Sequence, residues 1–254
     1  MSPPEIILVP LAGGSGAGRP LLVVGPSLGT GVEALWGICA GLLADRFDVV
    51  GWELPGHGRG TPHDEPFTMA ELAAGVARAV GRDSFLYAGD SLGGAVGLHL
   101  LLDHAHRVEA AALIATGAVI GTPDGWQDRA ALVRRQGTGA LVEGAIQRWF
   151  AAGFTARAPD RVMSLLDTLR AADDASYARC CEVLAGYDVR ARLGEIAAPV
   201  LAVAGAHDVV TTSASLAEIA GGVRHSRHIT IAGAAHMPPA EVPAEVAALI
   251  RSLI

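Results

Sequence analysis

The sequence predicts an α/β fold, in which a mostly parallel sheet has helices on both faces and is interrupted by a helical insertion. Short, continuously apolar runs alternate with longer segments of helical periodicity, the pattern of buried strands joined by crossover helices. This alternation stops after residue 115, and residues 121 to about 192 contain helical segments but no strong strand. We therefore predict a core formed by residues 1–120 and 193–254, with a helical lid at residues 121–192.

The first half of the chain supplies strands and helices in alternation. Each predicted strand is a short apolar run bounded by turn-forming residues, and each predicted helix repeats its apolar residues at helical spacing. A glycine-rich turn at 13–18 joins the first two strands, and Thr68 with Glu71 forms the capping box expected at a helix start. The predicted strands are 6–11, 21–25, 47–52, 85–88 and 110–115, and the predicted helices are 33–45, 69–80 and 92–104.

The insertion and the C-terminal part complete the pattern. Helical spacing indicates four pieces within the insertion, after which a strand, a helix, a strand and a closing helix follow in turn. The insertion pieces are 126–136, 140–150, 161–172 and 177–185, and the later elements are strand 199–205, helix 213–220, strand 228–231 and helix 242–254.

Composition excludes several classes of function. The net charge is −7 and there is no basic run, which argues against nucleic acid or an anionic membrane as a partner. All 19 basic residues are arginine, so a Schiff-base lysine, a phosphate-loop lysine and covalent pyridoxal phosphate chemistry are excluded. No apolar run reaches the ~18 residues of a membrane span. A small-molecule substrate is the partner we expect.

The three cysteines predict neither a disulfide framework nor a zinc site. Their number is odd, Cys180 and Cys181 are adjacent, and Cys39 is far from both. A Cys-x-x-Cys motif is absent from the sequence. This usage is typical of a reducing compartment, and we expect a cytoplasmic protein without a metal.

The segment around Ser91 carries the strongest functional signal. Gly89 and Gly93 flank this serine between an apolar strand and an apolar helix. Glycine–x–serine–x–glycine in that setting is the nucleophile elbow of the α/β-hydrolases. Side chains at the flanking positions would clash in so sharp a turn, and the helix N-terminus favours a developing negative charge. An ordinary tight strand-to-helix turn is the alternative interpretation.

A serine nucleophile needs a base and the base needs an orienting acid, in the chain order serine, acid, histidine. Asp208 follows the strand at 199–205, and His236 follows the last predicted strand. Both lie at carboxyl ends of strands, as Ser91 does, and that edge of an open α/β sheet is where sites form. Asp188 is the rival acid, and we interpret the other histidines as surface, capping or turn residues.

The oxyanion hole requires two N–H donors. We assign one to Leu92, directly after the nucleophile, and the other to Leu28, in the loop after the strand at 21–25. Residues 29–34 also match glycine–x–glycine–x–x–alanine, with Glu53 as a possible ribose-binding acid. Dinucleotide binding needs the first glycine tight against the strand, and here residues 26–28 intervene.

The chain resembles the 3-oxoadipate enol-lactonases within the α/β-hydrolases over nearly its whole length. The likeness lies in the loop 27–30 with Trp36 after it, and in the insertion stretches 125–134, 148–150, 177–182 and 187–190. Three positions depart from that family: Glu53 replaces the usual aspartate, Gly60 a common serine, and Asp90 an apolar residue. A carboxylate at position 90 would disfavour an anionic substrate if it pointed into the pocket.

The resemblance implies hydrolysis of an enol-lactone during the breakdown of aromatic compounds, through an acyl-enzyme and without metal or organic cofactor. As substrate contacts we expect Trp126, Arg134 and Trp149, where Arg134 or Arg135 would meet a substrate carboxylate unless it is a solvated helical arginine. A broad carboxylesterase and a cofactor-free perhydrolase or haloperoxidase could use the same three residues. A small-molecule receptor and a dinucleotide-binding protein are the remote alternatives.

Overall fold

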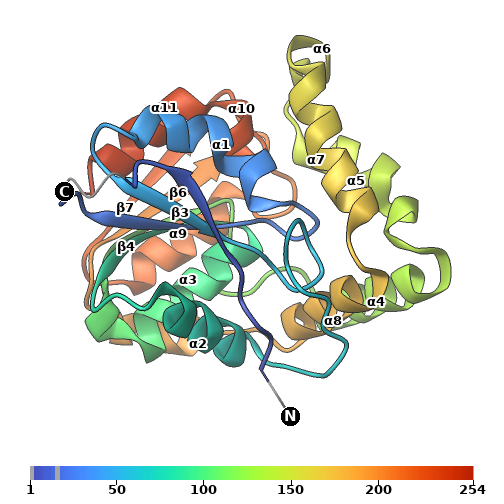
Figure 1. Ribbon diagram of the computed structural model, residues 1–254, viewed down its shortest axis with the longest axis horizontal. Coiled ribbons are helices and arrows are strands. Elements are labelled where there is room, and N and C mark those ends of the chain that lie inside the picture. The colour runs from blue at the N-terminus through green and yellow to red at the C-terminus, as the bar shows by residue number, and fades with distance from the viewer. Residues whose placement is uncertain (1–2, 15–17, 254) are drawn as a thin grey trace.

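The computed structural model describes residues 3–14 and 18–253, and within these residues seven strands form one sheet (Figure 1). The sheet order is β1-β3-β2-β4-β5-β6-β7, in which β1 runs antiparallel to β3 and all other neighbours are parallel. The predicted α/β class with a mostly parallel sheet is confirmed. The strands are β1 (Leu8–Ala12), β2 (Leu21–Gly25), β3 (Asp48–Trp52), β4 (Phe85–Asp90), β5 (Val108–Ile114), β6 (Val200–Gly205) and β7 (Ser226–Ile231).

Helices cover both faces of this sheet. Figure 1 shows α1 (Val32–Leu43), α10 (Pro238–Glu241) and α11 (Pro243–Arg251) on one face, and α2 (Met69–Val80) with α3 (Leu92–Asp103) on the other. Helix α9 (Ser213–Gly222) packs on β6 and β7. Strands β2, β4 and β6 are buried almost throughout, as expected for parallel strands covered on both sides.

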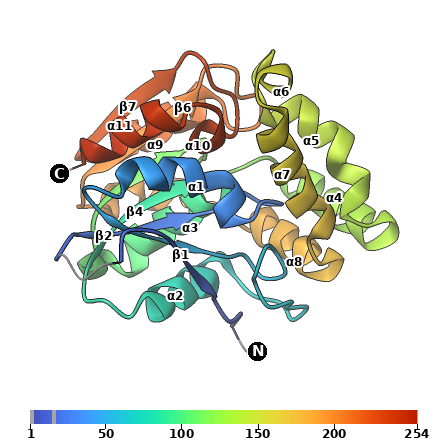
Figure 2. The same cartoon turned by 45° about the horizontal axis from the view of Figure 1, so that its top comes forward.

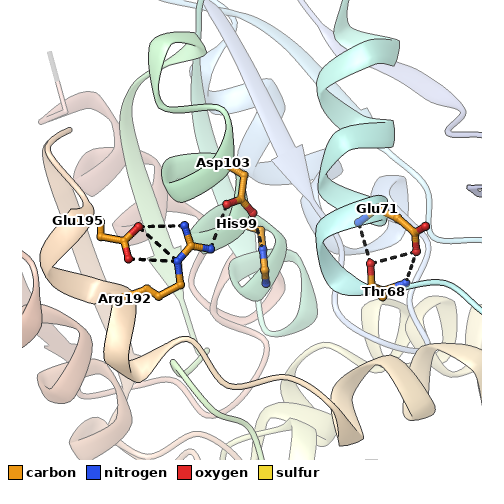
Figure 3. Close-up of polar contacts among 6 residues, drawn as sticks. All are labelled: Thr68, Glu71, His99, Asp103, Arg192 and Glu195. Carbon is orange, nitrogen blue, oxygen red and sulfur yellow. Dashed lines mark hydrogen bonds and ion pairs between the residues drawn. The ribbon is translucent and has the colours of Figure 1, made fainter.

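The start of α2 shows how local sequence sets an element boundary. The N–H of Glu71 donates to Thr68 Oγ1 at 3.1 Å, and the N–H of Thr68 donates to Glu71 Oε2 at 2.8 Å (Figure 3). The predicted capping box is confirmed. Figure 3 also shows the guanidinium of Arg192 between Asp103 at the end of α3 and Glu195, which ties the end of the insertion to the core.

The chain between β5 and β6 is helical, and both views place its main helices together beside the sheet (Figures 1 and 2). Its two ends meet: Val119 and Asp188 form an isolated bridge, and the N–H of Val189 donates to Ala118 O at 2.9 Å. The helical elements are α4 (Pro123–Gln136), η2 (Thr138–Leu141), α5 (Val142–Trp149), α6 (Phe154–Arg157), α7 (Pro159–Ala171), α8 (Asp174–Ala185) and η3 (Arg190–Glu195).

Several predicted element boundaries were wrong for identifiable reasons. The helix expected from residue 126 begins at Pro123, because Thr122 caps it and proline is well suited to the first helical turn. Pro243 likewise starts α11, one residue after the start expected for the closing helix, and the short α10 before it was not predicted. The short α6 and η3 were missed. Residues 15–17 of the predicted glycine-rich turn and residue 254 of the closing helix lie outside the described residues.

Candidate active site

Ser91 occupies a sharp turn between β4 and α3. Its φ of 53° is left-handed, a conformation that costs about 1–3 kcal/mol for a residue with a side chain and persists only where its surroundings enforce it. A Cβ at position 89 would lie 2.3 Å from Gly93 O, and one at position 93 would lie 2.7 Å from Pro26 O. Gly89 and Gly93 are therefore needed for the close approach of strand, helix and neighbouring loop, as the sequence predicted.

The structure brings together the three residues expected at the strand ends. His236 Nε2 lies 3.0 Å from Ser91 Oγ, and His236 Nδ1 lies 2.8 Å from Asp208 Oδ2. An ionised carboxylate can only accept, so Nδ1–H donates to Asp208 and Nε2 is left to accept the Ser91 hydroxyl proton. All three residues are buried, which strengthens these electrostatic contacts relative to water.

Asp208 is held as a carboxylate by its surroundings. Burial favours protonation, but the charge and hydrogen bond of His236 and the N–H groups of Val210 and Thr211 lower the pKa of Asp208 below its usual value. The two N–H groups donate to Oδ1 at 2.7 and 3.1 Å, and Thr211 Oγ1 donates to Oδ2 at 2.8 Å. The rival Asp188 is exposed and pairs with Arg190 at 2.6 Å.

Of the two residues assigned to an oxyanion hole, Leu28 lines a cavity together with Ser91, and Leu92 is next to Ser91 in the chain, at the start of α3. The N–H of Gly93 donates to Pro26 O at 2.9 Å, which fixes the loop against the elbow. Within residues 18–253, the N–H groups of Leu28 and Leu92 have no protein acceptor, so both are free to bind an oxygen of a substrate.

Glu53 has a structural role that opposes the dinucleotide alternative. Its buried carboxylate accepts the N–H of Val32 at 3.0 Å, directly at the start of α1. A pyrophosphate would need that same helix N-terminus. Burial, the leading cause, raises the pKa of Glu53 to about 7, and a second backbone N–H, from Arg59, reaches the other carboxylate oxygen.

A cavity of about 310 Å³ opens beside Ser91 Oγ, between the sheet edge and the insertion. Trp126 of α4 and Trp149 of α5 line it, as expected from the sequence, together with Tyr177 of α8. The wall is otherwise mostly apolar, and its remaining lining residues include Leu28, Ile120, Leu141, Ala145, Leu169 and Val210. The insertion therefore forms much of the cavity's wall.

Arg134, the arginine that we expected to contact a substrate, lies outside the cavity. Its guanidinium pairs with Glu182 at 2.7 Å. Arg129 and Arg148 line the cavity instead. Helical spacing contained the signal: Trp126 and Arg129 are three residues apart on α4 and therefore neighbours on one face, and the guanidinium lies 4.8 Å from the Trp126 ring centroid.

These two arginines form a positive region without a compensating carboxylate. Among the salt bridges of residues 3–14 and 18–253, none involves Arg129 or Arg148. Burial and the charge of Arg129 lower the pKa of Arg148, as expected for two cations held close together. A negatively charged group of a ligand would relieve this repulsion.

Asp90 does not face the cavity, contrary to the concern raised by its position beside the nucleophile. Its side chain is fully buried, and both carboxyl oxygens lack a hydrogen-bond partner within the described structure. Burial raises the pKa of Asp90 well above its usual value, and the negative charges of Asp208 and Glu241 add to this rise. Asp90 is therefore neutral under conditions in which an exposed aspartate is ionised.

Replacing Asp90 with asparagine is expected to stabilise the protein increasingly as pH rises. The folded pKa of Asp90 is raised, so in wild type stability falls as pH rises from the unfolded aspartate value of about 3.9 towards the folded value. The asparagine side chain does not titrate, so the free energy of unfolding of the variant should exceed that of wild type by about 1.4 kcal/mol more for each pH unit in that window. Urea unfolding at pH 5, 6 and 7 measures it, with the exposed Asp83→Asn as control. Parallel stability curves for wild type and Asp90→Asn would contradict the assignment.

Residues 3–14 and 18–253 contain neither a candidate metal cluster nor a helix suited to span a membrane. In the parts covered by residues 3–14 and 18–253, no group of three or more histidine, cysteine, aspartate or glutamate side chains is arranged to hold a metal ion. Over the same ranges, none of the helices has the length and apolar character that crossing a membrane requires. All three cysteines lie in the described part of the chain and are free and buried.

Comparisons with known proteins show the family to which the chain belongs. The family model for the alpha/beta hydrolase fold matches residues 20–242. The chain is 33% identical over 230 residues to 3-oxoadipate enol-lactonase 2 of Acinetobacter baylyi, covering 89% of this chain and 85% of the relative. It is 27% identical to a pimeloyl-[acyl-carrier protein] methyl ester esterase of Xanthomonas campestris, covering 77% and 80%. The crystal structure of the enol-lactonase from Burkholderia xenovorans superposes with a TM-score of 0.91 at 27% identity, covering 98% of this chain and 95% of the other.

Proposed function

The chain belongs to the alpha/beta hydrolase fold family and is a hydrolase of esters or lactones, and from this premise we propose that it opens a carboxylated enol-lactone. Ser91 acts as nucleophile, His236 as general base and then acid, and Asp208 orients the imidazole. The observation that carries the choice of substrate is the presence of two arginines without carboxylate partners in the cavity that contains Ser91. Two enol-lactonases among its relatives support the reaction type.

In the first half of the reaction His236 Nε2 takes the proton from Ser91 Oγ, which attacks the lactone carbonyl carbon. The resulting oxyanion is bound by the N–H groups of Leu28 and Leu92, a contribution of about 10²–10³ in rate for each such donor. The bond between the carbonyl carbon and the enol oxygen breaks, and His236 returns the proton to that oxygen. The enol, which stays attached to the acyl chain, then rearranges to a ketone, and this rearrangement favours ring opening.

In the second half, water enters beside the acyl-enzyme, whose acyl chain still carries the former enol group. His236 Nε2 takes a proton from this water, and the hydroxide attacks the ester carbonyl of acylated Ser91. The bond to Ser91 Oγ breaks and the serine recovers its proton from His236. Neither step requires a metal or an organic cofactor, because imidazole and hydroxyl supply all the proton transfers.

Removing either cavity arginine is expected to weaken binding of carboxylated substrates selectively. One charge-assisted hydrogen bond is worth about 1.5–3 kcal/mol, so Arg148→Met or Arg129→Met should raise KM for the enol-lactone by about 10–100-fold. Hydrolysis of p-nitrophenyl acetate, which has no carboxylate, should change little. Arg134→Met is the matched control, since this arginine of the same insertion pairs with Glu182 outside the cavity. Equal effects of all three variants on both substrates would exclude the arginine assignment.

A broad carboxylesterase is the second candidate, and the methyl ester esterase relatives favour it. A panel of one carboxylated enol-lactone, the corresponding uncharged lactone and several simple esters separates the two. The proposal expects kcat/KM to be highest for the carboxylated lactone. If kcat/KM for the simple esters equals or exceeds that for the carboxylated lactone, the esterase is favoured. Halogenation or peracid formation on adding peroxide would favour the perhydrolase.

A further inference from the structure

Glu241, the last residue of α10, connects the insertion with the loop that carries His236. Its carboxylate is buried, at 5% exposure, and lies away from the cavity. Oε1 accepts the N–H groups of Ala235 and Met237 at 2.8 and 3.3 Å, so it holds the backbone on either side of His236. Oε2 accepts the N–H of Ala151, from the insertion, at 2.7 Å.

The same two segments also meet directly. The N–H of His236 donates to Trp149 O at 3.1 Å, and Trp149 lines the cavity. Trp149 is thus bonded directly to His236, and Ala151 is linked through Glu241 to the residues on either side of His236. A displacement of the cavity wall at Trp149 would therefore act on the backbone of His236.

The acceptor in this link has to be a carboxylate. All three partners are N–H donors, and a buried carboxylate satisfies several such donors at once. A glutamine has one acceptor oxygen and one NH2 donor, so in either orientation its NH2 would face a backbone N–H on one side. Burial raises the pKa of Glu241, and the three N–H groups oppose that rise.

We propose that Glu241 is a positioning residue that couples the insertion to His236, so that the cavity wall and the alignment of the imidazole on Ser91 are set together. Glu241 touches neither substrate nor reacting atoms and acts through the amides on both sides of His236. The inference rests on the proposed roles of Ser91 and His236. It does not depend on which ester or lactone is the natural substrate.

The variant Glu241→Gln tests this coupling. A misplacement of about 1 Å at a reacting group can lower the rate about 10²-fold, so we expect kcat to fall about 10–100-fold with KM changed less than about twofold. The substrate is p-nitrophenyl acetate, and the rate of Ser91 labelling by a fluorophosphonate is measured in parallel, well below the melting temperature. A purely structural residue would lower the melting temperature and leave kcat unchanged, which would overturn the proposal.

Arg161→Met is the matched control. Arg161 also joins the insertion to α10, by donating to Ala240 O at 3.0 Å, but it does not contact the amides beside His236. We expect near wild-type kcat for this variant. Equal losses in Arg161→Met and Glu241→Gln would overturn the proposal, because general docking of the insertion would then explain both. If wild type hydrolyses activated esters but no lactone, the proposed substrate fails while the Glu241 comparison still stands.

A measurement on wild type keeps the proposal testable even if Glu241→Gln does not fold. If the Glu241 carboxylate moves away, it releases the N–H of Ala151 and the N–H of Ala235 together. These two amides should therefore exchange with solvent at rates within about threefold of each other. Hydrogen exchange followed by NMR gives both rates. Rates that differ by an order of magnitude or more would overturn the coupling.

Discussion

Replacing Ser91 with alanine is expected to abolish hydrolysis of enol-lactones and of activated esters alike. The hydroxyl that lies 3.0 Å from His236 Nε2 supplies the nucleophile, and no acyl-enzyme forms without it. Loss of a triad serine lowers kcat about 10⁶-fold in a serine protease, and we expect a loss of that order here. KM for any residual turnover should change little, because the cavity and its arginines are untouched.

Covalent labelling provides the control for the Ser91→Ala experiment. A fluorophosphonate should add one phosphonyl group to wild type and none to Ser91→Ala, as intact mass spectrometry will show. Ser27 is a second buried serine that lines the same cavity, and Ser27→Ala should still be labelled. Labelling of Ser91→Ala, or turnover in that variant close to wild type, would sink the assignment of the nucleophile.

The parts of the fold that the sequence predicted are those determined by local pattern. Strand β2 and helix α2 were predicted with their observed bounds, because an apolar run and a capping box mark their ends. The elbow was predictable because glycine, serine and glycine stand at fixed spacing between an apolar strand and an apolar helix, although the close contact at Gly93 is with the distant Pro26. That Asp208 and His236 lie beside Ser91 follows from a topological rule, since parallel strands end at one edge of the sheet.

The features that the sequence did not predict depend on side-chain orientation and on contacts between segments that are distant in the chain. The spacing from Trp126 could have indicated Arg129, but the ion pair that holds Arg134 outside the cavity depends on the position of Glu182 on α8. The burial of Asp90 depends on the direction of one side chain at the end of β4. Glu241 received no role from the sequence, because its donor Ala151 is distant in the chain and backbone amides leave no sequence signature.

Replacing Asp208 with asparagine is expected to lower kcat about 10⁴-fold while the fold is retained. Asp208 Oδ2 accepts Nδ1–H of His236 and thereby leaves Nε2 free to take the Ser91 proton. An asparagine that keeps its oxygen towards Val210 and Thr211 turns its NH2 towards the imidazole. That NH2 selects the tautomer protonated at Nε2, which cannot act as a base towards Ser91.

The exposed Asp188 supplies the matched control for that substitution. Asp188 was the rival acid in the sequence, and it pairs with Arg190 at the surface. Asp188→Asn should keep kcat within about twofold of wild type, because a surface ion pair contributes little. Steady-state kinetics on the lactone and on p-nitrophenyl acetate should therefore show a large loss of kcat in Asp208→Asn alone. If the two variants lose activity equally, or if Asp208→Asn keeps more than about a tenth of wild-type kcat, Asp208 does not set the tautomer of His236.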